Sequence, residues 1–561
     1  MLKTVLVTLL TGLFPGQEGQ KVQPAPSRPN IVVILADDMG FSDIGCYGGE
    51  IRTPHLDELA AGGLRFSQFY NSARCCPTRA SLLTGLYPHQ AGVGHMVQDL
   101  GKPGYTGELN ATCRTLGEVA QSAGYHTCAV GKWHVTGAAG AKGPKNNWPL
   151  GRGFDRYYGT IHGAGSFFDP SSLVRDNTMV SAFDDPEYKP STYYYTDAIS
   201  HHASRFVREH AASQSGKPFL MYMAYTAAHW PMHALPADIA RQKGRYDSGY
   251  EPVRQARWDK AAGLGLIDPT QGMSPAVGDW NKQDKTWEAA GMEVYAAMVE
   301  RMDLGIGQVV AELRKAGQFD NTLLLYLQDN GGCAEPMGRS PGKNHPNIAR
   351  PKAPTLPAMK ATEFITAGSV PAQTRDGYPV RMGNLVMPGP ADTYVAYGRN
   401  WATVSNTPFR EYKHWVHEGG ISTPLVAHWP RGISARGELR HQPGHLIDIM
   451  ATLVELAGAS YPQKATPLVG RSLLGAFAGK VIDREALYWE HEGNRAVRQG
   501  NWKLVARHKG PWELYDIAKD RVEGTDLSAS QPDKVRELAK LYQAYASRSL
   551  VEPWPVTGIQ P

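Results

Sequence analysis

The chain has 561 residues, which is too long for one ordinary compact core and predicts a large domain with a smaller companion. Its formal net charge of +5 is small for this length and 42% of its residues are hydrophobic, so the composition suits a globular enzyme and argues against a nucleic-acid partner. Six cysteines are too few for a disulfide scaffold.

The N-terminus has the features of a signal peptide, which we place at residues 1–20. Lys3 supplies a positive charge, and the apolar stretch at residues 5–14 is too short to span a bilayer. A disordered N-terminal tail is the alternative. No other apolar run is long enough for a membrane helix, so we expect a periplasmic or secreted protein without a transmembrane segment.

Apolar runs and helix-like segments alternate from residue 30 onward. The runs at residues 31–36, 219–225, 323–327 and 424–429 are continuous, as in strands of a buried sheet. Helical periodicity occurs at residues 56–64 and, more clearly, at residues 295–313. This alternation predicts an α/β fold with a large, mostly parallel or mixed sheet flanked by helices.

The chain changes character after residue 335. Residues 336–400 are rich in Pro, Gly and Lys and lack periodicity, so we expect an insertion near the active site that forms a wall or lid. A helix is predicted at residues 445–457. A C-terminal subdomain with an antiparallel sheet and a helix is predicted over residues 460–561, from β-like pieces at 486–489, 495–497, 502–505 and 512–515 and an amphipathic segment at 532–545.

Polar or charged residues follow four of the strand-like runs, including one at residues 126–130. In an open parallel sheet, all four groups would emerge at the carboxyl edge, where ligands bind. A single such residue is more often a cap or turn residue, but the shared position of all four groups favours a site. The residues are Asp37, Asp38, Lys132, His134, His229, Asp329 and Asn330.

Four of these residues offer hard oxygen atoms as metal ligands: Asp37, Asp38, Asp329 and Asn330. Such a set, without thiolate or imidazole, suits Ca²⁺ or Mg²⁺ and not zinc. The alternative is a group of helix N-caps, since Asp and Asn are favoured there.

The segment at residues 75–85 contains the pattern C-x-P-x-R followed by L-x-T-G. Pro77 suits the first turn of a helix, which we expect at residues 80–86. The N-terminus of this helix would present backbone N–H groups to an anion, and Arg79 would add a positive fork. The alternative is a helix start that matches the pattern by chance.

With this pattern, the sequence resembles the formylglycine-dependent type I sulfatases, close to bacterial arylsulfatases in the alkaline phosphatase superfamily. In that family the first cysteine of the pattern is oxidised to formylglycine, and Cys75 occupies that position. Cys76 falls on a variable position. Three further family motifs match at residues 131–134, 228–231 and 329–332. In a fourth motif, Lys413 stands five residues before Glu418, as the substrate-binding lysine of the family does.

The resemblance covers most of residues 30–520 and implies a catalytic domain over residues 29–459. It implies sulfate monoester hydrolysis, on aryl or carbohydrate sulfates, to an alcohol or phenol and sulfate. The implied cofactors are Ca²⁺ or Mg²⁺ and the formylglycine, and the implied partners are the ester substrate and a formylglycine-generating or sulfatase-maturing enzyme. The implied catalytic residues are Cys75, Arg79, Lys132, His134, His229 and Lys413, and the implied metal ligands are Asp37, Asp38, Asp329, Asn330 and modified Cys75.

The resemblance also implies the role of each group. One oxygen of the formylglycine hydrate attacks sulfur, with Asp329 as the base. His229, with help from Lys413, protonates the departing oxygen, and His134 then takes the proton of the second hydroxyl. Aromatic candidates for stacking on an aryl group or a sugar are Trp133, Phe167, Phe168 and Trp230.

Two other functions stay open at this point. A formylglycine-dependent phosphodiester or phosphonate monoester hydrolase of the same superfamily would use similar residues. A non-catalytic protein that binds sulfated glycans should have lost catalytic positions, and none of the ten implied positions is missing here.

Overall fold

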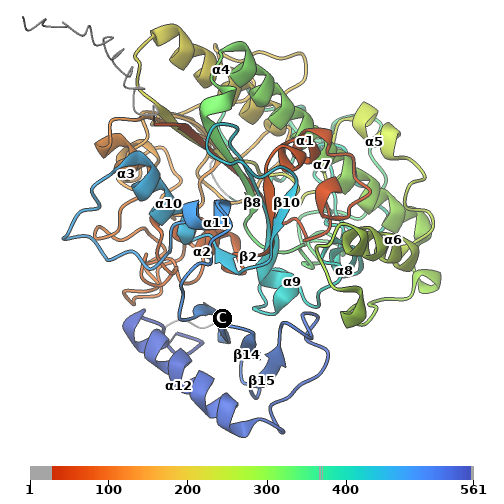
Figure 1. The fold of residues 1–561 in the computed structure, drawn as a ribbon. Helices are drawn as coiled ribbons and strands as arrows, with labels where there is room; N and C mark the ends of the chain where they lie inside the picture. Colours follow the sequence, from red (N-terminus) through yellow and green to blue (C-terminus); the bar gives the residue numbers. More distant parts are fainter. Residues whose placement is uncertain (1–27, 366–367, 369, 557–561) are drawn as a thin grey trace, which may run out of the picture.

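The computed structural model of the protein describes residues 28–365, 368 and 370–556. A large sheet with helices on both faces forms the main body, and a small sheet with the C-terminal helix lies against it (Figure 1). The predicted fold class is therefore confirmed. The predicted signal peptide lies outside the described residues. None of the helices in the described ranges combines the length and apolarity that crossing a bilayer requires.

The large sheet has 11 strands, and its centre is four neighbouring parallel strands in the order β8, β1, β7 and β3. Strand β9 runs antiparallel between β8 and β2, so the sheet is mixed. The full path is β10 (Glu438–Arg440), β2 (Leu64–Tyr70), β9 (Ser422–His428), β8 (Thr322–Gln328), β1 (Asn30–Ala36), β7 (Phe219–Ala224), β3 (His126–Lys132), β4 (Arg156–Thr160), β5 (Leu173–Arg175) and β6 (Thr178–Met179), with β11 (Gly444–His445) paired to β2.

Helices cover both faces because alternate residues of each central strand point to opposite sides. In β1, Val33 and Leu35 belong to one buried cluster, whereas Val32 and Ile34 belong to the other. The first cluster contains residues of α2 (Cys75–Thr84), α3 (Leu116–Ser122) and α10 (Asp448–Ala457), and the second contains residues of α1 (Pro54–Ala61), α4 (Tyr195–Ser213) and α7 (Lys285–Lys315). The other α-helices of the main body are α5 (Pro236–Gln242), α6 (Tyr250–Gly263), α8 (Arg399–Ser405), α9 (Glu418–Ile421) and α11 (Leu474–Phe477).

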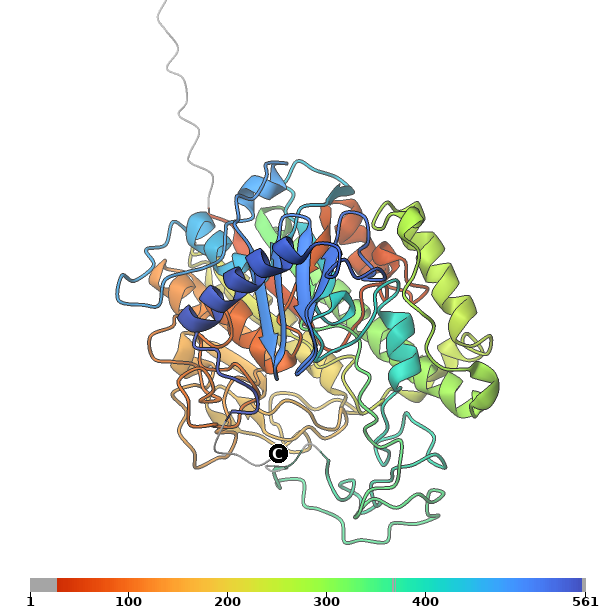
Figure 2. The same ribbon diagram turned by 90° about the horizontal axis from the view of Figure 1, so that it is seen from below.

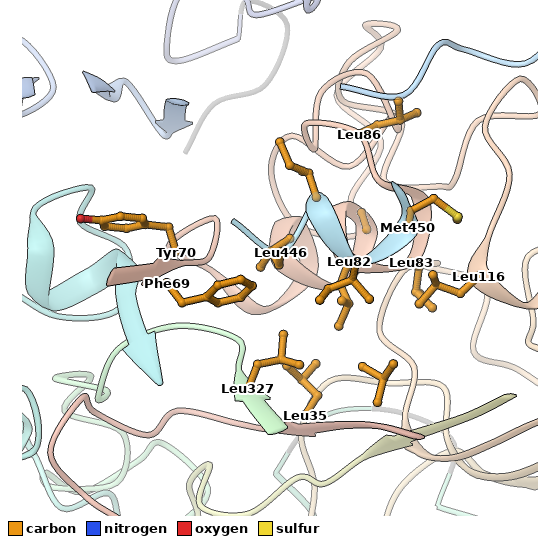
Figure 3. Close-up of a cluster of buried hydrophobic side chains, with 14 of the residues drawn as sticks. Leu35, Phe69, Tyr70, Leu82, Leu83, Leu86, Leu116, Leu327, Leu446 and Met450 are labelled. Atoms are coloured by element: carbon orange, nitrogen blue, oxygen red, sulfur yellow. The ribbon is translucent and has the colours of Figure 1, made fainter. Parts of the chain in front are cut away.

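Helix α2 is buried along its whole length. Figure 3 shows Leu82 above Leu35 and Leu327 of the sheet, and Leu83 beside Met450 of α10. Full burial of one leucine side chain contributes about 1.5–3 kcal/mol. These contacts hold the N-terminal turn of α2 at the edge of the sheet.

The small sheet is antiparallel and packs on the α2 side of the large sheet. Figure 2 shows α12 lying across it, where Tyr545 stacks on Tyr488 with ring centroids 4.4 Å apart. Buried Lys503 joins the two parts of the chain, because its ammonium lies 2.9 Å from Glu418 and 2.8 Å from Glu523. The elements are β12 (Leu487–His491), β13 (Asn494–Gln499), β14 (Trp502–Ala506), β15 (Glu513–Asp516) and α12 (Pro532–Arg548).

Several predicted element boundaries were wrong. The helix predicted at residues 56–64 ends at Ala61, and Leu64 instead begins β2, an alternating strand that the sequence reading missed. Helix α2 begins at Cys75 and not at residue 80, since Pro77 needs no partner for its nitrogen in the first turn. The helix predicted at residues 445–457 begins at Asp448, because His445 pairs with β2. Helix α7 extends well beyond residues 295–313 at its N-terminal end.

Candidate active site

The central parallel strands carry the predicted site residues to one edge of the sheet. Because β8, β1, β7 and β3 are adjacent and parallel, the segments that follow them lie side by side. The residues that emerge there are Asp37 and Asp38 after β1, Asp329 and Asn330 after β8, His229 beyond β7, and Lys132 and His134 at the end of β3.

Arg79, from α2, connects two of these segments in a buried network. Its Nη2 donates to Asp37 Oδ2 at 3.1 Å and to Asp329 Oδ2 at 2.8 Å. Lys132 Nζ also donates to Asp37 Oδ2. Burial and the charge of Asp329 raise the pKa of Asp37 to about 7, although Lys132 opposes them. The two aspartates therefore share Arg79, and Lys132 adds a second cation beside Asp37.

Asp38 is the centre of a second buried network. Lys413 Nζ lies 2.9 Å from both carboxylate oxygens of Asp38 and 3.4 Å from His229 Nε2. Asn330 donates its amide to Asp38 Oδ1 at 2.7 Å. Burial raises the pKa of Asp38, but Lys413 and His229 outweigh that effect and hold it below its usual value. Asp38 is thus a carboxylate anion that accepts from a lysine and an amide.

His229 is oriented by its neighbour. Its Nδ1 lies 2.6 Å from the carbonyl oxygen of Trp230, which leaves Nε2 to face Lys413 and the cavity described below. Burial lowers the pKa of His229, and Lys413 adds to this shift while Asp38 opposes it. A neutral ring with a proton on Nδ1 is the form that this geometry favours.

Two site residues have backbone φ angles that residues other than glycine rarely adopt. Asp38 has φ +58° and His134 has φ +54°, both in the left-handed region. Such strain is found where a side chain must take a particular direction. Here it turns both side chains into the group of residues at the sheet edge.

Cys75 is the first residue of α2 and faces the same edge. A hydrogen bond with Cys76 lowers the pKa of the Cys75 thiol most, and Lys132 and His134 lower it further while burial opposes them. Cys76, at a position that we treated as variable, places its Sγ 3.2 Å from His134 Nε2. Burial lowers the pKa of His134 to about 3, so its imidazole is neutral.

The oxygen-rich part of the edge fits a hard divalent cation. Asp37 Oδ1 and Asn330 Oδ1 are buried and accept no hydrogen bond from any described residue. Buried oxygen atoms of this kind normally have a partner, and carboxylate and amide oxygens are ligands that Ca²⁺ and Mg²⁺ accept. With Asp38 and Asp329 beside them, these residues can hold such an ion.

A cavity of about 680 Å³ opens above these groups, with Cys75, His134, His229 and Lys413 in its lining. Its outer wall comes from loops, including the 336–400 stretch, which has no helix or strand before α8 in its described residues. The other lining residues are Arg74, Met96, Val97, His162, Gly163, Ala164, Trp230, Glu335, Pro336, Met337, Gly338, Ser340, Gly342 and Met382.

The four aromatic candidates differ in their positions. Trp230 lines the cavity and donates its indole N–H to Glu335 at 2.7 Å. Trp133 and Phe167 are buried in the core, and Phe168 lines a neighbouring cavity. Of this set, Trp230 is the residue placed for contact with a substrate.

Glu335 and Arg74 are cavity residues that the sequence reading missed. Arg74 Nη1 lies 2.7 Å from Glu335 Oε1, and Lys413 Nζ lies 3.8 Å from Glu335 Oε2. Burial raises the pKa of Glu335, but Lys413 and Arg74 outweigh it and hold the pKa well below its usual value. Only weak features of the sequence indicated that these two residues reach the cavity: Arg74 directly precedes Cys75, and Glu335 shares a loop with Asp329.

Comparison with known families gives the class of protein that this fold and site define. The family model described as sulfatase matches residues 29–459, and that described as N-sulphoglucosamine sulphohydrolase, C-terminal, matches residues 410–544. The chain therefore belongs to the sulfatase family, and it hydrolyses sulfate esters.

Several curated proteins are similar over most of their length. An arylsulfatase of Klebsiella aerogenes is 32% identical over 82% of this chain and 94% of its own. An uncharacterised sulfatase of Schizosaccharomyces pombe is 30% identical over 95% and 96%, and an N-acetylgalactosamine-6-sulfatase of Rattus norvegicus is 27% identical over 90% and 76%.

Solved structures show the same fold at lower identity. The crystal structure of Ps i-CgsB has a TM-score of 0.64 and 24% identity, with 94% of each chain covered. A phosphonate monoester hydrolase of Agrobacterium radiobacter has a TM-score of 0.55 and 18% identity, covering 93% of this chain and 96% of that one. The fold is thus shared by enzymes that act on sulfur and on phosphorus esters, and it does not separate them.

Proposed function

We propose that this sulfatase acts through a formylglycine formed from Cys75 together with one bound Ca²⁺ or Mg²⁺. The observation that carries the proposal is the meeting of Cys75, His134, His229 and Lys413 in one cavity lining, directly beside the buried oxygen-rich edge. A formylglycine sulfatase needs a precursor of the nucleophile, groups that carry protons and ligands for a metal ion. These residues can provide all three.

The cation would be held by Asp37, Asp38, Asp329 and Asn330, with the modified residue 75 as a further ligand. When bound, it would supply positive charge to the sulfate oxygens. Arg79 and Lys132 hold the two carboxylates of the inner network in position through their hydrogen bonds. Such preorganised charge is typically worth several kcal/mol in the transition state.

The hydrated aldehyde would supply an oxygen nucleophile and a second hydroxyl, and Asp329 would accept the nucleophile's proton. Lys413 Nζ lies 3.4 Å from His229 Nε2, so Lys413 can protonate this nitrogen and the resulting imidazolium can pass the proton to the departing oxygen. Neutral His134, next to the two cysteines, can accept the proton of the second hydroxyl, which releases sulfate.

The cavity wall favours an uncharged, largely apolar leaving group. Met96, Val97, Trp230, Met337 and Met382 line it, and thioethers and indole adapt to flat or irregular apolar surfaces. The charged side chains beyond the floor, Arg74 and Glu335, neutralise each other. We therefore favour aryl sulfates over carbohydrate sulfates with further anionic groups.

The mature protein is proposed to be periplasmic or secreted. The support is the sequence of residues 1–20, with Lys3 before a short apolar stretch. A formylglycine-generating or sulfatase-maturing enzyme would be needed to oxidise Cys75.

Turnover of nitrophenyl sulfate and of a nitrophenyl phosphodiester by the mature enzyme tests the reaction class. We expect sulfate release to exceed phosphodiester hydrolysis in kcat/KM. The opposite order would support a phosphodiester or phosphonate monoester hydrolase, and release from neither ester class would support a non-catalytic binding protein.

A further inference from the structure

A second group of potential metal ligands lies where the small sheet meets the catalytic part of the chain. Glu492 and Gly493 form the turn between β12 and β13, and His491 ends β12. His95, from the loop after α2, and His414 both lie close to the carboxylate of Glu492. Three imidazoles therefore surround one carboxylate outside the active site.

The distances within this group suit a tetrahedral metal centre. Glu492 Oε1 lies 3.1 Å from His95 Nδ1 and 3.6 Å from His491 Nε2, and the three ligand atoms all lie within 4.8 Å of one another. Metal–ligand bonds of about 2.0–2.1 Å in a tetrahedron place ligand atoms about 3.3 Å apart. The ligand atoms lie within 4.8 Å of one another, so they would have to draw together by at most about 1.5 Å to bind one ion.

Within the described part of the chain, the buried ring nitrogens of His491 lack hydrogen-bond partners. Its side chain is fully buried, and neither ring nitrogen has a hydrogen bond to any residue in the described ranges. A buried polar atom without a partner costs about 1–3 kcal/mol. A metal bond at Nε2, which faces Glu492, would remove much of that cost.

Glu492 occupies a backbone position that glutamate disfavours. Its φ is +51° and that of Gly493 is +80°, and two-residue hairpin turns of this kind prefer Asn or Asp before Gly. The strained turn thus presents its carboxylate to the three histidines.

His414 orients the carboxylate of Glu492 from the edge of the group. Its Nδ1 lies 3.4 Å from Glu492 Oε2, while its Nε2 lies 3.2 Å from the amide of Asn494. The same amide donates to the carbonyl of His491 at 2.9 Å. Partners of this kind orient metal-binding residues in proteins.

We propose that His95, His491 and Glu492 bind a zinc-class transition-metal ion, with water as the fourth ligand. Imidazole with one carboxylate suits zinc, in contrast to the all-oxygen set of the active site. The ion would tie the β12–β13 hairpin to the loop that continues into Met96 and Val97 of the cavity wall. Its role is structural, and it does not depend on the formylglycine chemistry.

The zinc content of the full-length mature protein tests the site. Wild type, Glu492→Gln and His95→Gln are loaded with Zn²⁺ in excess Ca²⁺, dialysed, and measured by elemental analysis. We expect both variants to hold about one zinc ion per chain less than wild type. His441→Gln, which changes an exposed histidine bonded to Ser67, is the matched control and should keep the wild-type zinc content.

The comparison separates this site from the active site. The group of Cys75, Cys76 and His134 is another candidate for zinc, but it is unchanged in both variants, so zinc bound there cancels. In excess Ca²⁺, a zinc-selective chelator should lower the melting temperature of wild type and leave that of Glu492→Gln unchanged. Equal zinc content in wild type and both variants, or equal chelator effects, would overturn the proposal and leave a metal-free ion-pair cluster.

Discussion

The floor and the outer wall of the active-site cavity are built in different ways. The floor consists of charged side chains at the ends of the central strands and at the start of α2, each buried and paired with another charge. The wall consists mainly of apolar side chains on loops, including the 336–400 stretch. Strand ends thus fix the position of the reaction, whereas the loops present the surface that a leaving group contacts.

The two regions should also respond differently to mutation. Removing one partner of a buried charge pair leaves the other charge uncompensated, at a cost of about 3–5 kcal/mol. Removing a half-buried apolar side chain loses about 0.8 kcal/mol per methylene. Substitutions in the floor should therefore affect turnover, and substitutions in the wall should affect binding.

Replacement of Cys75 should have the largest effect. Cys75→Ala removes the precursor of the nucleophile and should lower kcat by about 10⁴-fold or more, whichever sulfate ester is used. Cys76→Ala is the matched control and should keep activity within about tenfold of wild type, because Cys76 contacts His134 but is not modified. A Cys75→Ala enzyme with substantial turnover of aryl sulfates would contradict the assignment of the floor.

Replacement of Asp38 should remove the active-site metal. Asp38→Asn keeps the shape of the side chain but removes its negative charge, which both Lys413 and the cation need. The Ca²⁺ or Mg²⁺ content should therefore fall, and kcat should drop by about 10²–10³-fold. Elemental analysis and kinetics measure both. Asp303→Asn, a buried aspartate that caps α1 away from this edge, should retain the metal. Full metal content in Asp38→Asn would show that the ion binds elsewhere.

Replacement of His229 should have an effect that depends on the leaving group. A nitrophenolate departs without a proton, whereas an alkoxide needs one, so His229→Ala should lower turnover of an alkyl sulfate by about 10²–10⁴-fold and that of nitrophenyl sulfate much less. Both esters carry the same sulfate, so contacts with that group largely cancel. Equal fractional losses in a folded, metal-loaded variant would transfer the proton-donor role to Lys413.

Replacement of Met337 should have the smallest effect. Met337→Ala removes apolar area from the wall and should raise KM for an aryl sulfate by about three- to tenfold with little change in kcat. Leu385→Ala, in the same stretch but largely exposed and outside the cavity lining, should leave both constants unchanged. A large drop in kcat for Met337→Ala would mean that the wall takes part in the chemistry.

Much of the fold and the candidate floor could be predicted from the sequence, for a physical reason. Continuous apolar runs such as residues 31–36 indicate buried strands directly, and the carboxyl ends of parallel neighbours must meet at one edge. Strand β2 was missed because polar residues interrupt its apolar pattern and a register shift between Phe66 and Phe69 breaks the alternation, although most of the strand is buried.

The wall and the histidine group could not be predicted in this way. Glu335 and Met382 reach the cavity from a stretch without periodicity, so their positions depend on tertiary packing. His95 and His491 are almost 400 residues apart and meet only because the small sheet packs against the loop after α2. No local pattern connects such residues before the chain is folded.

The chemical state of residue 75 in active enzyme distinguishes formylglycine catalysis from catalysis by an unmodified thiol. Peptide mass spectrometry of the fragment that contains Cys75 and Cys76 can be compared between fully active and inactive preparations. We expect formylglycine or its hydrate at residue 75, an ordinary cysteine at residue 76, and specific activity proportional to the modified fraction. A fully active preparation with residue 75 entirely as thiol would contradict this expectation.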